Sequence, residues 1–147
     1  RMNYTMMGDT VNLAARLESS CKQYGVFTQI SDSTYSSVKD RFVIRELDRI
    51  IVVGRKEPVT TYELISRIGE ESDNMKKLLP DFTKAISLYR SQEWDKAIEL
   101  FQSIDYLEDM HEGRKTNPCR TYVKRCEQYK QDPPPKNWDG VTALTSK

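Results

Sequence analysis

The chain has 147 residues, and 23 Lys and Arg against 22 Asp and Glu give it a formal net charge of +1. Near-neutral charge argues against nucleic-acid binding, which needs a strongly basic face. No apolar run approaches the roughly 18 residues that a membrane helix needs, and no signal-peptide core follows the N-terminal Arg1. The composition therefore predicts a soluble globular chain of one domain or two small ones.

The cysteines and the histidine indicate no metal or disulfide framework. Cys21, Cys119 and Cys126 are scattered and lack a CxxC spacing, a pattern typical of free thiols in a reducing compartment. His111 is the single histidine, which argues against a His-based metal site or catalytic triad. Its polar neighbours predict a solvated loop residue.

Residues 1–65 mix short strand-like runs with helices, which is an α+β pattern. Met2 to Met7 predicts the end of a strand, broken by Gly8 and Asp9. Residues 10–18 then have apolar side chains at helical spacing, with Asp9 as the expected cap and Gly25 as the expected end. The later elements are expected to be a strand at 26–30, a short helix that Ser31 caps and that runs through Val38, strands at 42–47 and 49–53 joined through Asp48, a turn at 54–58 and a strand at 59–65.

Helical periodicity dominates the second half, after a polar segment at 66–77 that predicts a linker. Residues 82–89 and 94–101 form two apolar stripes that predict a hairpin, in which Ala85 and Ala97 would allow close approach. The hairpin resembles a tetratricopeptide unit, although the next helix, at about 120–130, does not repeat the pattern. One unit cannot bury its own face, so we expect it to pack on another part of the protein. Trp138 is the expected anchor of a Pro-rich tail with a turn at 138–141.

Asn12 and Arg16 stand out because they lie four residues apart and share one face of the predicted helix. Asn offers a donor and an acceptor, and Arg offers a planar fork suited to phosphate oxygens. Such a pair can hold the sugar and the phosphate of a nucleotide together. On spacing alone, the other interpretation is a partly exposed helix whose Asn and Arg make surface hydrogen bonds.

The identities of the surrounding residues favour nucleotide binding over surface hydrogen bonds. The segment 8–18, Gly-Asp-Thr-Val-Asn-Leu-Ala-Ala-Arg-Leu-Glu, resembles the signature of class III nucleotidyl cyclases. The segments 52–59, Val-Val-Gly-Arg-Lys-Glu-Pro-Val, and 62–64, Tyr-Glu-Leu, resemble the closing strands of that domain. The resemblance implies a partial ferredoxin-like cyclase core at 1–65, then the linker at 66–77, an all-α tetratricopeptide-like tail at 78–131 and a Pro-rich C-terminal segment at 132–147.

The same resemblance assigns roles to site residues. Asn12 would orient the ribose, and Arg16 would hold charge on the triphosphate as the 3′-oxygen attacks the α-phosphorus. Thr5 falls at the base-reading position and resembles a bacterial-type subclass with a hydroxyl there. Arg55 falls where the family places a Lys near base and phosphates, and the neighbouring Lys56 could substitute for it; a solvated turn is the other interpretation of both.

The implied activity is that of a purine nucleotide cyclase, most simply an adenylate cyclase that converts ATP to 3′,5′-cyclic AMP and pyrophosphate. GTP stays open because Thr5 is permissive. The family binds two Mg²⁺ ions through two Asp residues earlier in the domain. Because Asp9 and Asp32 are expected as helix caps, no metal ligand is assigned here. The ligands are expected upstream, and the chain alone is expected to be inactive.

The family works as head-to-tail dimers, so a homodimer is expected in which this chain contributes Asn12 and Arg16. We expect a cytoplasmic location, with any membrane tether lying in upstream segments. Two alternatives stay open. One is a non-catalytic cyclase-like domain that dimerises or regulates, and the other is a tetratricopeptide-like protein-interaction module.

Overall fold

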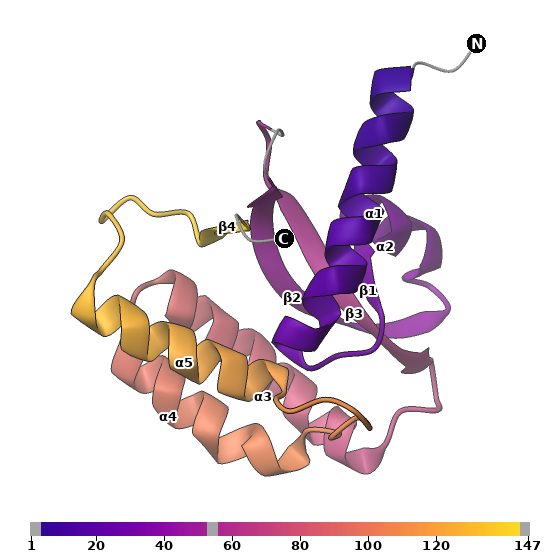
Figure 1. The fold of residues 1–147 in the computed structure, drawn as a ribbon. Coiled ribbons are helices and arrows are strands. Elements are labelled where there is room, and N and C mark those ends of the chain that lie inside the picture. The colour runs from indigo at the N-terminus through magenta and orange to yellow at the C-terminus, as the bar shows by residue number, and fades with distance from the viewer. Residues whose placement is uncertain (1–3, 53–55, 145–147) are drawn as a thin grey trace.

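A computed structural model describes residues 4–52 and 56–144, with side chains for 13–52 and 56–143. Within these ranges the chain forms five α-helices, one short 3₁₀ helix and one four-stranded sheet (Figure 1). In this part of the chain, no helix has the length and apolar character needed to span a membrane.

The first helix, α1 (Tyr4–Tyr24), is longer than the sequence predicts. The predicted strand is wrong for residues 4–7, and Asp9 lies inside α1 rather than at its cap. The flanks of the sheet are β1 and β4, and residues 4–7 pair with neither. Without a partner strand, a helix pairs the amides and carbonyls of this segment internally. The predicted end is confirmed, because Gly25 follows α1 with φ +78° and donates its amide to the Cys21 carbonyl at 2.8 Å.

The sheet has the strand order β1-β3-β2-β4. Its strands are β1 (Gln29–Ser31), β2 (Phe42–Val52), β3 (Val59–Arg67) and β4 (Val141–Leu144). The first three pair antiparallel, and β4 pairs in parallel with the end of β2. The short helix α2 (Asp32–Val38) begins after Ser31, as predicted. Its Tyr35 stacks on Tyr62 of β3, with ring centroids 4.2 Å apart.

Three predictions about strands need correction. The strand predicted at 26–30 is β1, which occupies only Gln29–Ser31. The separate strands predicted at 42–47 and 49–53 are one strand, β2, whose register shifts between Glu46 and Asp48. Such a bulge interrupts the alternation of side chains without ending the strand. Val141, predicted as part of a turn, starts β4 and pairs with Arg49. β4 forms by pairing with a segment that is distant in the sequence, and local residue preferences are too weak to predict such a strand.

The remaining helices form a layer against the sheet (Figure 1). They are α3 (Asp73–Arg90), α4 (Trp94–Ile104), the 3₁₀ helix η1 (Asp105–Leu107) and α5 (Pro118–Gln131). The predicted hairpin is confirmed as α3 and α4, and Ala85 and Ala97 are fully buried. Helix α3 already starts at Asp73, because Ser72 caps it by accepting a hydrogen bond from the amide of Met75 at 3.1 Å.

Helix α5 covers the apolar face of the α3–α4 hairpin. Tyr122 is fully buried and stacks on Phe101 of α4, with centroids 5.3 Å apart. Asn117 caps α5 by accepting from the amide of Arg120 at 2.9 Å. The expectation that the hairpin packs on another part of the protein is therefore met by α5 and the sheet. Its resemblance to a tetratricopeptide unit stays a prediction.

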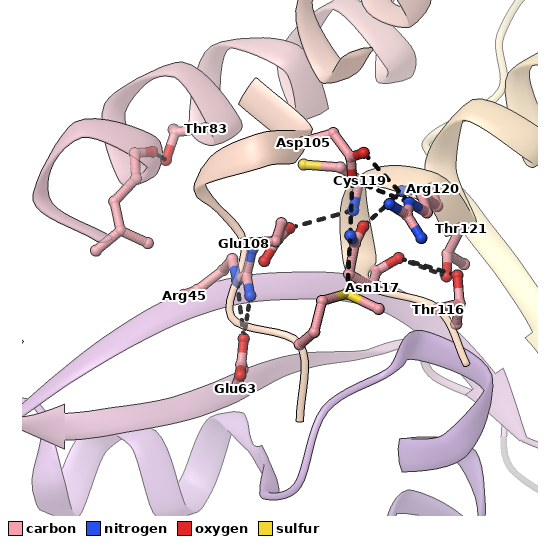
Figure 2. Close-up of polar contacts among 12 residues, drawn as sticks. Arg45, Glu63, Thr83, Asp105, Glu108, Thr116, Asn117, Cys119, Arg120 and Thr121 are labelled. Carbon is pink, nitrogen blue, oxygen red and sulfur yellow. Dashed lines mark hydrogen bonds and ion pairs between the residues drawn. The ribbon is translucent and has the colours of Figure 1, made fainter. Parts of the chain in front are cut away.

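A buried ion network joins the sheet to this helical layer (Figure 2). Arg45 of β2 pairs with Glu63 of β3 and, at 2.8 Å, with Glu108, which follows η1. Glu108 also accepts a hydrogen bond from the amide of Cys119 at 3.3 Å. The Arg45 guanidinium lies 4.7 Å from the centre of the Phe82 ring of α3. Sheet and helices therefore share one interior.

Trp138 anchors the C-terminal segment, as predicted. Its ring packs edge-on against Tyr89 of α3, at 5.3 Å between centroids, and contacts Trp94 and Tyr129. The Trp138 indole donates to the carbonyl of Val141 at 3.1 Å, so the anchor directly precedes β4. The three cysteines are free thiols, as predicted, and all three are buried.

Candidate active site

Helix α1 brings Asn12 and Arg16 together along its backbone. The two residues lie one turn apart, and their α-carbons share a face of the helix. Arg16 is half-buried, whereas the side chains of Asn12 and Thr5 lie outside the described residues. Beside this face, Leu17 is buried and packs with Leu13 against Ile50 and Val52 of β2. Apolar packing therefore fixes the middle of α1 on the sheet.

The connection between β2 and β3 carries the other two site predictions. Arg55 lies outside the described residues, and Lys56 is exposed just before β3. The end of β2, the start of β3 and the N-terminal half of α1 lie toward the same end of the molecule (Figure 1). Of the five predicted site residues, Thr5, Asn12 and Arg16 therefore belong to α1, and Lys56 lies just before β3.

A hollow of about 500 Å³ lies beside α1, between the helix, β1 and the start of α2. Its polar lining consists of two carboxylates, Glu18 and Asp32, with hydroxyls and one amide. Among the described residues that line it, none is a lysine or an arginine. A hollow without cationic side chains is unsuited to a triphosphate, which prefers Arg and Lys donors.

Carboxylates for a metal pair are not assembled in the described part of the chain, where no group of three His, Cys, Asp or Glu residues converges. Asp32 is exposed at the first position of α2, where its charge complements the helix N-terminus. The Asp9 side chain lies outside the described residues. The described side chains do not fit a magnesium site, so no chemical step is assigned to a metal here.

The C-terminal end of α1 is held by a buried contact that the sequence does not predict. Tyr24 of α1 and Arg125 of α5 both contact the fully buried carboxylate of Asp48. Burial first, and then the negative charge of Asp48, hold the pKa of Tyr24 far above its ordinary value. The sequence carries a signal for this contact, because Asp48 is a charged residue within an apolar strand. The same pattern also fits a connection between two separate strands.

His111 lies in a loop, as predicted, but it is partly buried rather than fully solvated. Its Nε2 lies 3.6 Å from Oε2 of the buried Glu63, and its ring packs on Phe27 with centroids 4.2 Å apart. The neighbouring Glu63 carboxylate raises the pKa of His111. The loop after η1 folds back over the sheet, which a local reading of polarity cannot reveal.

Comparison with known proteins points to one class. Residues 1–66 match the family described as "Adenylate and Guanylate cyclase catalytic domain". This range contains all of the predicted site residues: Thr5, Asn12, Arg16, Arg55 and Lys56.

Individual relatives carry the name adenylate cyclase. The chain is 33% identical over 132 residues to "Adenylate cyclase, terminal-differentiation specific" of Dictyostelium discoideum. It is 38% identical over 65 residues to "Adenylate cyclase 1" of Rhizobium meliloti and 40% identical over 67 residues to "Adenylate cyclase" of Mycobacterium bovis. These matches cover 87%, 44% and 46% of the chain. No solved structure matches the chain.

The matched regions are small parts of those relatives. The chain spans 6%, 10% and 14% of their respective lengths. The Dictyostelium alignment covers 87% of this chain, whereas the family match ends at residue 66. The similarity to that relative therefore continues from the cyclase region into the helical layer.

Proposed function

We propose that this chain is part of an adenylate cyclase and contributes Asn12 and Arg16 to the reacting nucleotide. The observation that carries the proposal is the match of residues 1–66 to the cyclase catalytic domain. The backbone of α1 supports the proposal, because it holds Asn12 and Arg16 one turn apart, next to the apolar contact of the helix with β2.

In the proposed reaction, the 3′-oxygen of ATP forms a bond to the α-phosphorus. The bond from that phosphorus to the oxygen of the leaving pyrophosphate breaks, and the 3′-hydroxyl proton passes to water. Asn12 orients the ribose by hydrogen bonding. Arg16 stabilises negative charge on the phosphate oxygens, and this is effective because a fixed guanidinium needs little reorganisation as charge moves.

Further residues are proposed to contact the base and the phosphates of the substrate. Thr5 reads the purine edge through its hydroxyl, and Arg55 or Lys56 approaches the nucleotide from the β2–β3 connection. Divalent metal ions are general in this class. Since the described residues hold no metal site, we propose that their ligands come from elsewhere in the protein, across a head-to-tail dimer.

The test measures cyclic AMP formation from ATP by the full-length protein, with cyclic GMP formation from GTP in parallel. We expect Arg16→Ala and Asn12→Ala each to lower kcat by roughly a hundredfold or more, the scale for removing one donor to developing charge. Lys22→Ala is the matched control, because Lys22 is an exposed cation in the last turn of the same helix. It should leave kcat within about twofold.

Folding is checked in parallel by circular dichroism and thermal melting. Full activity in a folded Arg16→Ala variant would contradict the assigned role. A wild-type protein that dimerises but makes neither cyclic nucleotide would favour the non-catalytic alternative. A preference for GTP would correct the substrate and leave the roles of Asn12 and Arg16 in place.

A further inference from the structure

The end of α1 is held by the helical layer as well as by the sheet. Thr121 of α5 donates its hydroxyl to the carbonyl of Gln23 at 3.1 Å. Arg114 donates from Nε to the carbonyl of Val26 at 2.9 Å. Gly25 lies so close to the backbone of Thr116 that a Cβ there would come within 2.1 Å of its carbonyl oxygen. Residues 114–121 therefore clasp the last turn of α1.

A buried triad completes this attachment. Arg125 of α5 contacts the Asp48 carboxylate with Nη1 at 2.9 Å and donates from Nη2 to the Tyr24 hydroxyl at 3.1 Å. Tyr24 in turn donates to the same carboxylate oxygen of Asp48. All three residues are buried, Tyr24 and Asp48 fully so. One positive and one negative charge compensate each other, and the tyrosine hydroxyl links both to α1.

This triad, defined as Tyr24, Asp48 and Arg125, joins three elements at one point. Tyr24 belongs to α1, Asp48 to the bulge of β2, and Arg125 to α5. A bulge aims a side chain away from the regular alternation of a strand, which here turns Asp48 toward both helices. The orientation of α1 on the sheet thus depends on a residue far outside the region that matches the cyclase family.

The position of α1 rests on two attachments of different origin. Leu13 and Leu17 hold its middle against the end of β2 through apolar contacts, which are not directional. The triad and the clasp hold its last turn through directional hydrogen bonds, which resist rotation and sliding of the helix. Rotation of α1 about its own axis would swing Arg16 away from a phosphate that lies beside the helix.

We propose that α5 is a positioning element of the cyclase, which acts through Arg125 to fix Asn12 and Arg16 by way of Tyr24. The inference rests on the proposed function of that pair. It also explains why similarity to the Dictyostelium cyclase runs beyond the family match into the helical layer. Arg125 and Tyr24 are positioning residues, since neither lies at the candidate phosphate face.

The test compares two removals of a buried tyrosine hydroxyl in the full-length protein. Tyr24→Phe removes the hydroxyl that joins α1 to the triad. Tyr122→Phe is the matched control, because its equally buried hydroxyl donates to the carbonyl of Leu47 at 2.5 Å and joins α5 to the sheet only. We expect Tyr24→Phe to lower kcat roughly tenfold with the KM for ATP within about twofold, because misplaced catalytic groups cost rate rather than ground-state binding.

The control should keep kcat within about twofold, even with a melting temperature as low as that of Tyr24→Phe. Arg125→Met should lower kcat at least as much as Tyr24→Phe, and the double variant should be no worse than Arg125→Met alone, since both act through one triad. Thr121→Val, which removes one clasp hydrogen bond at a part-exposed site, gives a milder loss of kcat should Arg125→Met fail to fold. Amide hydrogen exchange in α1 should be faster in Tyr24→Phe than in Tyr122→Phe.

Two failures can be told apart. If wild-type protein is inactive, or Arg16→Ala is fully active, the proposed function is wrong. If wild-type protein is active and Arg16→Ala is not, but Tyr24→Phe and Tyr122→Phe lower kcat equally or not at all, the positioning role is overturned and the triad serves stability alone.

Discussion

At the scale of single residues, the pair His111 and Glu63 is the clearest departure from expectation. Burial would by itself raise the pKa of Glu63, but Arg45 and His111 outweigh that effect and lower the pKa. The Glu63 carboxylate, which lies beside the imidazole, is the main cause of the raised pKa of His111. A histidine that gains a partner on folding binds its proton more tightly in the native state, so it makes stability depend on pH.

The sign of that dependence follows from the raised pKa. The contribution of protonated His111 is fully present below its ordinary pKa of 6.5 and is lost as the pH rises through the raised native value. We expect the urea midpoint of wild-type protein to fall between about pH 5.5 and about pH 8.5, and His111→Gln to flatten this change. No other histidine titrates in this window. An equal fall in both proteins would contradict the pairing.

At the scale of elements, the residues that precede α5 and α2 make different side-chain contacts. Asn117 accepts from the amide of Arg120 at 2.9 Å and donates to Asp105 at 2.7 Å, so it caps α5 and ties it to η1. Ser31 occupies the same position before α2, but its side chain accepts no hydrogen bond from a backbone amide of that helix. Its hydroxyl contacts Ser33 instead, at 3.0 Å. Only the first of these caps satisfies a free amide of its helix.

These two caps differ in their predicted contribution to stability. Asn117→Ala should lower the free energy of unfolding by about 1–2 kcal/mol, because a helix amide and Asp105 both lose a partner. Ser31→Ala should change it by less than about 0.5 kcal/mol. Urea denaturation of the two variants measures the difference. Similar losses in both would mean that the contacts of Asn117 are not what stabilises the start of α5.

At the scale of the whole molecule, buried charges unite the sheet with the helical layer. Arg45 holds Glu63 of the sheet and Glu108 of the helical layer, and all three are almost completely buried. Such a network contributes little beyond apolar packing while it is complete, but removal of one partner leaves an uncompensated charge in the interior. We therefore expect the two layers to unfold together.

The expected cost of breaking this network is large. Arg45→Met should lower the free energy of unfolding by about 3–5 kcal/mol. Arg120→Ala, which removes a half-exposed pair with Asp105, should cost less than about 1 kcal/mol. Both tryptophans, Trp94 and Trp138, lie in the helical layer, so their fluorescence reports on it while circular dichroism reports on the whole chain. Coincident transitions are expected, and separate ones would mean that the layers unfold independently.

Local chemistry determined much of the fold. The apolar spacing of residues 82–101 predicted the α3–α4 hairpin, and Gly25 predicted the end of α1, because helical periodicity and a positive φ are properties of short segments. The motif at residues 8–18 predicted the class that the comparisons then matched over residues 1–66. The roles of Asn12, Arg16, Thr5, Arg55 and Lys56 stay predictions.

Only the tertiary structure decided the features that depend on distant partners. Asp48 looked like a break between strands, yet it is the buried centre of a triad with Tyr24 and Arg125, two residues 101 positions apart. Val141 looked like part of a turn, yet it pairs with Arg49. A buried charge or an edge strand is stable only beside a partner, and a partner contributed by a remote segment has no trace in the local sequence.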